Sequence, residues 1–220
     1  MSPEIFSLLF ESLGETLYMV AVSMICASIL GIPLGILLVV TEKGEILACP
    51  AINKPLAFII NMIRSIPFII LMVAIIPFTR FLVHTSIGTT AAIVPLTIAA
   101  IPYIARMVET SIREIPSGLI EAAESMGATP MQIIRKVLLP EALPSILESL
   151  TVVIVSLVGA SAMAGTIGGG GLGMIAISFG YQRFNNDIVW ICVLLTVIIV
   201  QLIQELGMLI ARKADKRINK

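Results

Sequence analysis

The sequence has few charged residues. Asp, Glu, Lys and Arg make up 13% of its 220 residues, about half the share that is usual in soluble domains. Hydrophobic residues make up 58%, and the mean hydropathy is +1.05. This composition excludes a soluble globular domain and indicates a single integral membrane domain over residues 1–220. The formal net charge is zero, so we expect no nucleic-acid partner.

Side chains that commonly catalyse reactions or bind metals are also scarce. The chain has one histidine, His84, and three scattered cysteines. Cys26 and Cys192 lie in apolar runs, where we expect small core residues rather than a disulfide or metal ligands. Ser161 faintly resembles a buried serine nucleophile, which needs a base within hydrogen-bond reach, and no second histidine is available. We therefore expect no catalytic residue, no metal site and no cofactor bound by this chain.

Basic residues are absent from the start of the chain. No Lys or Arg precedes Lys43, whereas Glu4, Glu11 and Glu15 lie near the N-terminus. A secretory signal peptide begins with a positively charged region. We therefore expect the first apolar run to be a membrane span rather than a signal peptide.

Long apolar runs are abundant, and five of them can cross a bilayer core, which needs about 20 residues per helix. They cover residues 16–40, 56–82, 87–108, 145–163 and 188–210. The pattern predicts an all-α, polytopic membrane protein with five transmembrane helices. In the first run, Gly31 and Gly35 predict the close approach of another helix. In the second run, Pro67 and Pro77 predict an irregular helix.

Three residues in the runs are candidates for a transport pathway. Arg64 lies in the second run, and a charge deep in lipid costs at least ~2.5 kcal/mol. It therefore faces protein or water as a pathway or interface residue, or the lipid-buried part begins after it. Ser161 and Met163, at the end of the fourth run, are candidates for a gate, although Met in a span usually serves packing. The glycine-rich residues 165–173 that follow lack the Gly-Lys-Ser/Thr ending of a phosphate loop, and we expect flexible or tightly packed turns there.

Residues 117–140 form the longest charged, interrupted stretch, and they predict two short helices joined by a turn. Ser117 is expected to cap the first helix, and Gly127 to close it in the left-handed conformation. Thr129 and Gln132 have the spacing of a capping box for the second helix. Pro140 is expected to end that helix. One face is polar and the other apolar. An amphipathic helix that lies on the bilayer surface therefore stays an alternative interpretation of this stretch.

The same stretch resembles the coupling segment of permease subunits of bacterial ABC importers. Their motif is Glu-Ala-Ala, three residues, Gly, nine residues, then Ile-x-Leu-Pro; the matching residues here are Glu121, Ala122, Ala123, Gly127, Val137, Leu139 and Pro140. Val137 replaces the usual Ile. A DNA-binding helix-turn-helix is the competing motif, but membrane runs flank the stretch and the net charge is zero. Further likeness at 64–67, 114–116, 138–144 and 159–173 is to the permeases of methionine importers.

The resemblance implies a type I ABC importer permease fold, a homodimer of this chain, two ATPase subunits and an extracytoplasmic substrate-binding protein. ATP and Mg would be used by the partner ATPase. Glu121 would make a charged contact with that ATPase, Ala122 and Ala123 would allow close approach, and Gly127 would set the turn. The substrate implied is methionine, in its L and D forms. Another amino acid or a small peptide stays an alternative, and so does a stand-alone secondary transporter, which the scarcity of titratable groups in the runs disfavours.

The distribution of Lys and Arg predicts the orientation in the membrane, because cytoplasmic loops carry an excess of both. With five spans the termini lie on opposite sides. Placing the C-terminus in the cytoplasm and the N-terminus outside leaves only Arg80 and Arg183 outside, with Arg64 undecided. The cytoplasmic segments then hold Lys43, Lys54, Arg106, Arg113, Arg135, Lys136, Arg212, Lys213, Lys216, Arg217 and Lys220. We expect a multi-pass protein of the bacterial cytoplasmic membrane, with residues 117–140 on the ATP-containing side.

Overall fold

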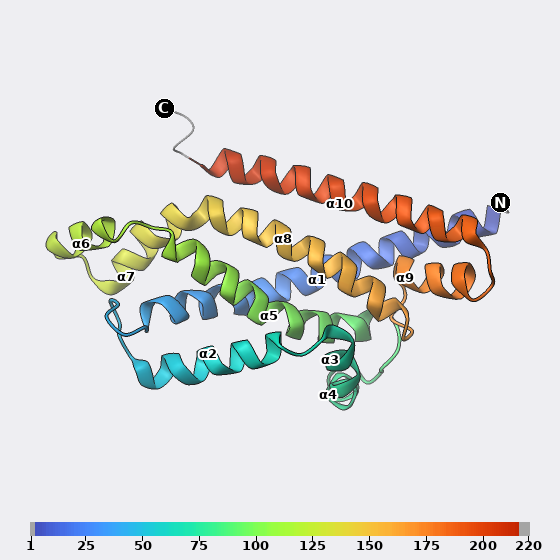
Figure 1. Cartoon of the computed structure of the whole chain (residues 1–220), viewed down its shortest axis with the longest axis horizontal. Coiled ribbons are helices and arrows are strands. Elements are labelled where there is room, and N and C mark those ends of the chain that lie inside the picture. The colour runs from blue at the N-terminus through green and yellow to red at the C-terminus, as the bar shows by residue number, and fades with distance from the viewer. Residues whose placement is uncertain (1–2, 216–220) are drawn as a thin grey trace.

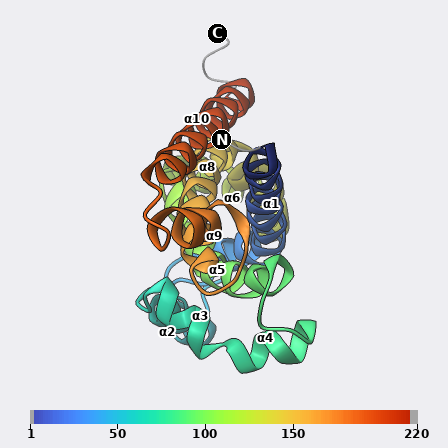
Figure 2. The same ribbon diagram turned by 90° about the vertical axis from the view of Figure 1, so that its right-hand side faces the viewer.

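The structure is a computed structural model that describes residues 3–215 as a bundle of helices, with no strand in that range (Figure 1). Four helices are long and apolar enough to cross a membrane: α1 (Pro3–Val40), α5 (Thr89–Arg113), α8 (Leu139–Gly165) and α10 (Asn186–Ala214). Viewed along the bundle, α10 lies at one edge and α2 to α4 at the opposite edge, with α1, α5 and α8 between them (Figure 2). The predicted all-α membrane fold is confirmed. Lys216, Arg217 and Lys220, which were predicted to lie in the cytoplasm, are outside the described residues.

The second span is broken at Pro67, so the irregular helix predicted there is confirmed, whereas the expected bounds of 56–82 were wrong because the bent pair covers residues 50–74. Helix α2 (Pro50–Arg64) is followed by α3 (Phe68–Ala74) at an angle of 102°, and α4 (Ile76–Val83) comes next. Pro67 directly precedes α3. Proline has no N–H to donate and disfavours the helical conformation of the residue before it, so the helix stops and the chain turns. Together, α2 and α3 make up the fifth possible crossing.

The two ends of the bundle are distinct. The N-terminus and α9 (Gly171–Ile175) lie at one end, which we call the N-terminal end (Figure 1). The short helices α6 (Ser117–Ser125) and α7 (Pro130–Ile133) lie at the opposite end, which we call the α6 end, and α10 runs toward it. The chain thus begins and ends on opposite sides, as an odd number of crossings requires.

Helices α1 and α5 pack closely because α1 has glycine at the contact. A Cβ atom on Gly31 would lie 2.8 Å from Ile104 Cβ, and one on Gly35 would lie 2.6 Å from the carbonyl oxygen of Ala105. Both distances are shorter than side-chain contacts in real proteins, so only glycine fits without a shift. Ile104 is fully buried there. The predicted close approach at Gly31 and Gly35 is confirmed.

The glycine-rich link after α8 is tightly packed and contains a helix that the sequence analysis missed. Helix α9 continues into the π-helical turn η2 (Ala176–Tyr181). The first N–H groups of α9 are bound by α1: Gly171 N donates to Glu15 Oε2 at 2.6 Å, and Leu172 N donates to Thr16 Oγ1 at 2.9 Å. Side chains of α1 therefore cap α9, which fixes the N-terminal end of the bundle.

The two cysteines predicted as core residues differ in exposure. Cys192 in α10 is buried, as predicted, whereas Cys26 in α1 is exposed. The prediction for Cys26 was wrong because an apolar run in a membrane protein does not imply burial within the chain. Apolar positions that face lipid or another subunit have the same composition as core positions.

Candidate functional site

The candidate docking surface lies at the α6 end of the bundle, in the connection between α5 and α8. It consists of α6, a turn, α7 and the π-helical turn η1 (Ile134–Leu138) (Figure 1). We call residues 117–140 the docking segment. Because α5 leads into it and α8 leads out of it, a force on this segment acts directly on two spanning helices.

The turn between α6 and α7 has the geometry that its sequence predicts. Gly127 has a φ of +77°, a left-handed conformation that costs glycine little. Its N–H donates to the carbonyl oxygen of Glu124 at 2.8 Å, and Ala128 N donates to that of Ala123 at 3.1 Å. These two bonds form a Schellman motif, which satisfies the last carbonyl groups of α6. The helix end is therefore well defined rather than frayed.

The second short helix begins with the predicted capping box. Gln132 N donates to Thr129 Oγ1 at 3.4 Å, and Thr129 N donates to Gln132 Oε1 at 2.8 Å. Pro130 occupies the first turn of α7, where its missing N–H costs nothing. The turn and the cap together leave little freedom between α6 and α7.

Two predictions about the ends of the docking segment were wrong. Ser117 does not cap α6, because Pro116 occupies the N-cap position and no side chain caps the helix. Pro140 does not end the second helix; it is the second residue of α8 and directly follows the π-helical turn η1. Residues 130–165 therefore run on as one apolar helix through the π-helical turn. The docking segment is continuous with the fourth span rather than separated from it.

One face of the docking segment is anchored in the core of the protein. Ala123, Ile133 and Leu138 are buried in the same apolar cluster as residues of α1 and α5. Ala123 was predicted to permit close approach to an ATPase, and in this chain its methyl group packs inward. Ala122, one residue earlier, is exposed.

The opposite face is exposed and combines apolar and charged side chains. Met126 is 82% exposed and Met131 55%, and the sequence analysis assigned neither a role. The charged members are also exposed: Glu121, Glu124, Arg135 and Lys136. Exposed apolar side chains rimmed by charge are typical of surfaces that bind another protein, and methionine is enriched in such interfaces. This face is therefore suited to protein docking.

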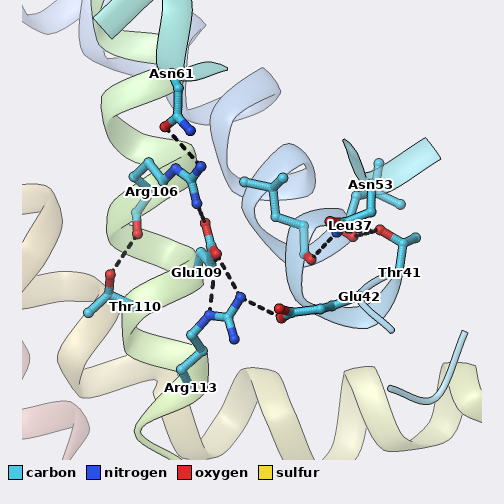
Figure 3. A network of polar contacts seen from close by, with 10 residues as sticks. Leu37, Thr41, Glu42, Asn53, Asn61, Arg106, Glu109, Thr110 and Arg113 are labelled. Atoms are coloured by element: carbon cyan, nitrogen blue, oxygen red, sulfur yellow. Dashed lines mark hydrogen bonds and ion pairs between the residues drawn. The ribbon is translucent and has the colours of Figure 1, made fainter. Parts of the chain in front are cut away.

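An ionic network centred on the buried Glu109 holds the helices together near the α6 end (Figure 3). Glu109 of α5, only 6% exposed, accepts hydrogen bonds from Arg106 at 2.5 Å and from Arg113 at 2.9 Å. Arg113 also pairs with Glu42, in the link after α1, and Arg106 donates to Asn61 Oδ1 of α2 at 2.9 Å. The network therefore ties α5 to both α1 and α2. The spacing of Arg106, Glu109 and Arg113 on one helix was the signal for it in the sequence, and the analysis missed it.

The three pathway candidates do not come together in one cluster. Ser161 is buried, and its Oγ donates to the carbonyl oxygen of Val158 at 2.8 Å, so its hydroxyl group is already bonded within α8. Met163 is 50% exposed near the end of the same helix. Arg64 ends α2, with its guanidinium 5.6 Å from the centre of the Tyr103 ring of α5. Arg64 instead shares a cavity with Tyr103 and with Ser156 and Ala160 of α8.

Residues 31–220 match the model of the family described as "Binding-protein-dependent transport system inner membrane component". The chain belongs to this family. It is therefore a multi-pass inner-membrane component of a transport system, and the resemblance found in the docking segment extends over most of the chain.

Individual relatives agree with the family. A protein of Vibrio cholerae named "Probable D-methionine transport system permease protein MetI" is 53% identical over 210 residues, which cover 96% of this chain and 93% of the relative. The "D-methionine transport system permease protein MetI" of Escherichia coli K12 is 51% identical over 165 residues, which cover 75% of this chain and 76% of the relative.

Solved structures support the same fold. A chain from "Inward facing conformations of the MetNI methionine ABC transporter" is 50% identical, has a TM-score of 0.96, and is matched over 98% of this chain and 100% of its own. A chain of an amino acid ABC transporter is 20% identical with a TM-score of 0.79, over 96% of this chain and 95% of its own. The second likeness concerns the fold alone.

Proposed function

We propose that this chain is the transmembrane permease subunit of an ATP-driven ABC importer for methionine. The observation that carries the proposal is the match to a methionine transporter structure at a TM-score of 0.96 and 50% identity over nearly the whole chain. The relatives named as D-methionine permeases support the D enantiomer as a substrate, and we propose the L enantiomer beside it. A permease for another amino acid is the alternative.

In this proposal the docking segment binds a separate ATPase in the cytoplasm, and that partner binds ATP and Mg²⁺. Two copies of the chain associate with two ATPase subunits, and an extracytoplasmic binding protein delivers the substrate. The N-terminus lies outside and the C-terminus in the cytoplasm. Glu121, exposed on α6, makes a charged contact with the ATPase, and Gly127 fixes the angle at which α6 and α7 are presented.

The proposed coupling follows from the connectivity of the docking segment. Its buried face packs in the core with α1 and α5, and η1 passes without a break into α8. Closure of the ATPase pair around ATP would therefore shift α5 and α8 together, since packed helices move as rigid units. The chain contributes the pathway, and the ATPase supplies the free energy.

Reconstitution tests the proposal. The permease, an ABC ATPase that co-purifies with it and a methionine-binding protein are placed in proteoliposomes, and uptake of labelled L- and D-methionine is measured with ATP and with a non-hydrolysable analogue. We expect uptake that requires ATP hydrolysis and all three components. Uptake by the permease without any ATPase would indicate a secondary transporter. ATP-driven uptake of a different amino acid, and not of methionine, would show that the other amino acid is the substrate.

A charge reversal tests the docking surface. Glu121→Lys should lower the amount of ATPase that co-purifies with the permease, because it places a cation where an anion is proposed to meet the partner. Lys136→Arg, which keeps the charge on the same surface, serves as the control. Full retention of the ATPase by the Glu121→Lys permease would rule out a direct contact at this position.

A further inference from the structure

Arg64 lies in a position where a charge needs a partner. It is the last residue of α2, and α2 stops about midway between the two ends of the bundle (Figure 1). A charge at such a depth is costly unless it faces protein or water. Among residues 5–215, no carboxylate forms an ion pair with Arg64. Its guanidinium instead faces the Tyr103 ring, 5.6 Å from the ring centre.

A cavity of about 190 Å³ adjoins this pair of side chains. Its walls come from α2, α3, α5 and α8, and they are mostly apolar, with Phe68, Leu71 and Leu157 among them. The hydroxyl group of Ser156 and the guanidinium of Arg64 are polar exceptions. One water needs about 10–15 Å³ of such space, so the cavity is large enough for a ligand of the size of one free amino acid.

We propose that this cavity is an intramembrane binding site for the transported amino acid, in which Arg64 binds the α-carboxylate and the Tyr103 ring with the apolar wall binds the side chain. The inference rests on the proposed function, which supplies the substrate. A guanidinium presents a fork of donors that matches a carboxylate. A thioether makes favourable contacts with an aromatic ring, so the two groups recognise the two ends of methionine.

The walls of the cavity connect this site to the docking segment. Tyr103 lies on α5, which leads into that segment, and Ser156 lies on α8, which leads out of it. Arg64 lies on α2, which Asn61 joins to α5 through its hydrogen bond with Arg106. A movement of the docking segment therefore changes the spacing of the carboxylate-binding and side-chain-binding walls. The affinity of the site is expected to differ between the states that the ATPase imposes.

Photolabelling in the assembled complex locates the site. The permease–ATPase complex in lipid nanodiscs is incubated with a diazirine analogue of methionine, irradiated and digested, and labelled peptides are identified by mass spectrometry. We expect label in residues 63–71, 99–103 and 153–160 of the permease, removed by excess methionine but not by methioninamide, which lacks the carboxylate. Specific label confined to other parts of the permease, or equal competition by methioninamide, would overturn the proposal.

Variants of the two recognition residues complete the test. Arg64→Gln should reduce specific labelling about 10- to 100-fold, the effect expected for one lost charge-assisted interaction, and Arg64→Lys should retain part of it. Arg80→Gln, at an exposed arginine that donates to Ser86 Oγ, is the matched control and should label as the wild type does. Undiminished labelling of Arg64→Gln would refute a carboxylate-binding role.

The two proposals fail separately. ATP-driven methionine uptake by the wild-type complex without labelling of this cavity would reject the intramembrane site and would still support the proposed importer function. Absence of methionine uptake, with uptake of another substrate, would reject the proposed function and with it this site for methionine. If the Arg64→Gln complex does not assemble, the labelling pattern of the wild-type complex still decides whether methionine binds in this cavity.

Discussion

At the scale of single residues, Glu109 is the side chain on which the α6 end depends most. It accepts hydrogen bonds from two arginines and is almost completely buried. Removing one partner of a fully buried ion pair typically costs about 3–5 kcal/mol, and the cost here is smaller because Arg106 is 22% and Arg113 45% exposed and Arg113 keeps its ion pair with Glu42. Glu109→Gln keeps the shape but leaves Arg106 and Arg113 without their shared anion.

We expect Glu109→Gln to lower the thermal stability of the purified permease by less than that range, measured by thermal unfolding in detergent. Glu11→Gln removes a carboxylate at an exposed position of α1 and serves as the control, with stability unchanged. Equal unfolding temperatures for the two variants would mean that the network adds no net stability.

A second residue-scale prediction concerns the contact between α1 and α5. Gly35→Ala places a methyl group 2.6 Å from the carbonyl oxygen of Ala105 and 2.7 Å from Val108 Cβ. Overpacking of this kind usually costs about 1–3 kcal/mol. Gly14→Ala is the matched control on the same helix, since nothing lies within 4 Å of the added atom. We expect a lower unfolding temperature for Gly35→Ala only; no difference between the variants would contradict the close packing.

At the scale of elements, the turn between α6 and α7 sets how the docking surface is presented. A residue with a Cβ in the left-handed conformation costs roughly 1–2 kcal/mol, so Gly127→Val should disturb the turn and separate ATP hydrolysis from uptake. Gly118→Ala, in α6 with free space around it, should behave as the wild type. Both variants are compared in proteoliposomes by the ratio of substrate imported to ATP hydrolysed. An unchanged ratio for Gly127→Val would dismiss the role of this turn.

The local sequence was sufficient to predict the elements whose geometry depends only on neighbouring residues. The capping box of Thr129 and Gln132 and the left-handed Gly127 are both short-range features, and both were predicted. Gly31 and Gly35 also identified the packing face of α1 without reference to its partner. Few other residue types suit these positions, because of the backbone conformation at Gly127, the hydrogen-bond pattern at Thr129 and Gln132, and the lack of space for a Cβ at Gly31 and Gly35.

Features that depend on distant residues could not be derived in this way. The capping of α9 joins Glu15 to Gly171, which lie 156 residues apart, and the bond from Arg106 to Asn61 spans 45 residues. Pro67 indicated a break, but the 102° angle is set by where α3 packs. Pro140 was interpreted as a helix end, but the helix continues past it through the π-helical turn η1, so the continuous path from the docking segment to α8 was missed.

At the scale of the whole molecule, the arrangement of helices separates two chemically different ends. The α6 end carries the loop after α1, the start of α2, the end of α5, the docking segment and the end of α10 (Figure 1). These segments hold most of the basic residues among residues 3–215, namely Lys43, Lys54, Arg113, Arg135, Lys136, Arg212 and Lys213. The N-terminal end carries α9 and the link before α10 with Arg183. By the bias of basic residues toward the cytoplasm, the α6 end is expected to face the cytoplasm.

Labelling of single cysteines tests this orientation. Cys26, Cys49 and Cys192 are first replaced by serine, and one new cysteine is then introduced by Lys43→Cys in the loop after α1 or by Phe184→Cys, at a side chain that is 91% exposed. A membrane-impermeant maleimide applied to intact spheroplasts should label Phe184→Cys at once, and Lys43→Cys only after the membrane is permeabilised. The reverse pattern would place the docking segment outside the cell, where no ATP-driven partner could reach it, and labelling of both sites in intact spheroplasts would contradict an odd number of crossings between them.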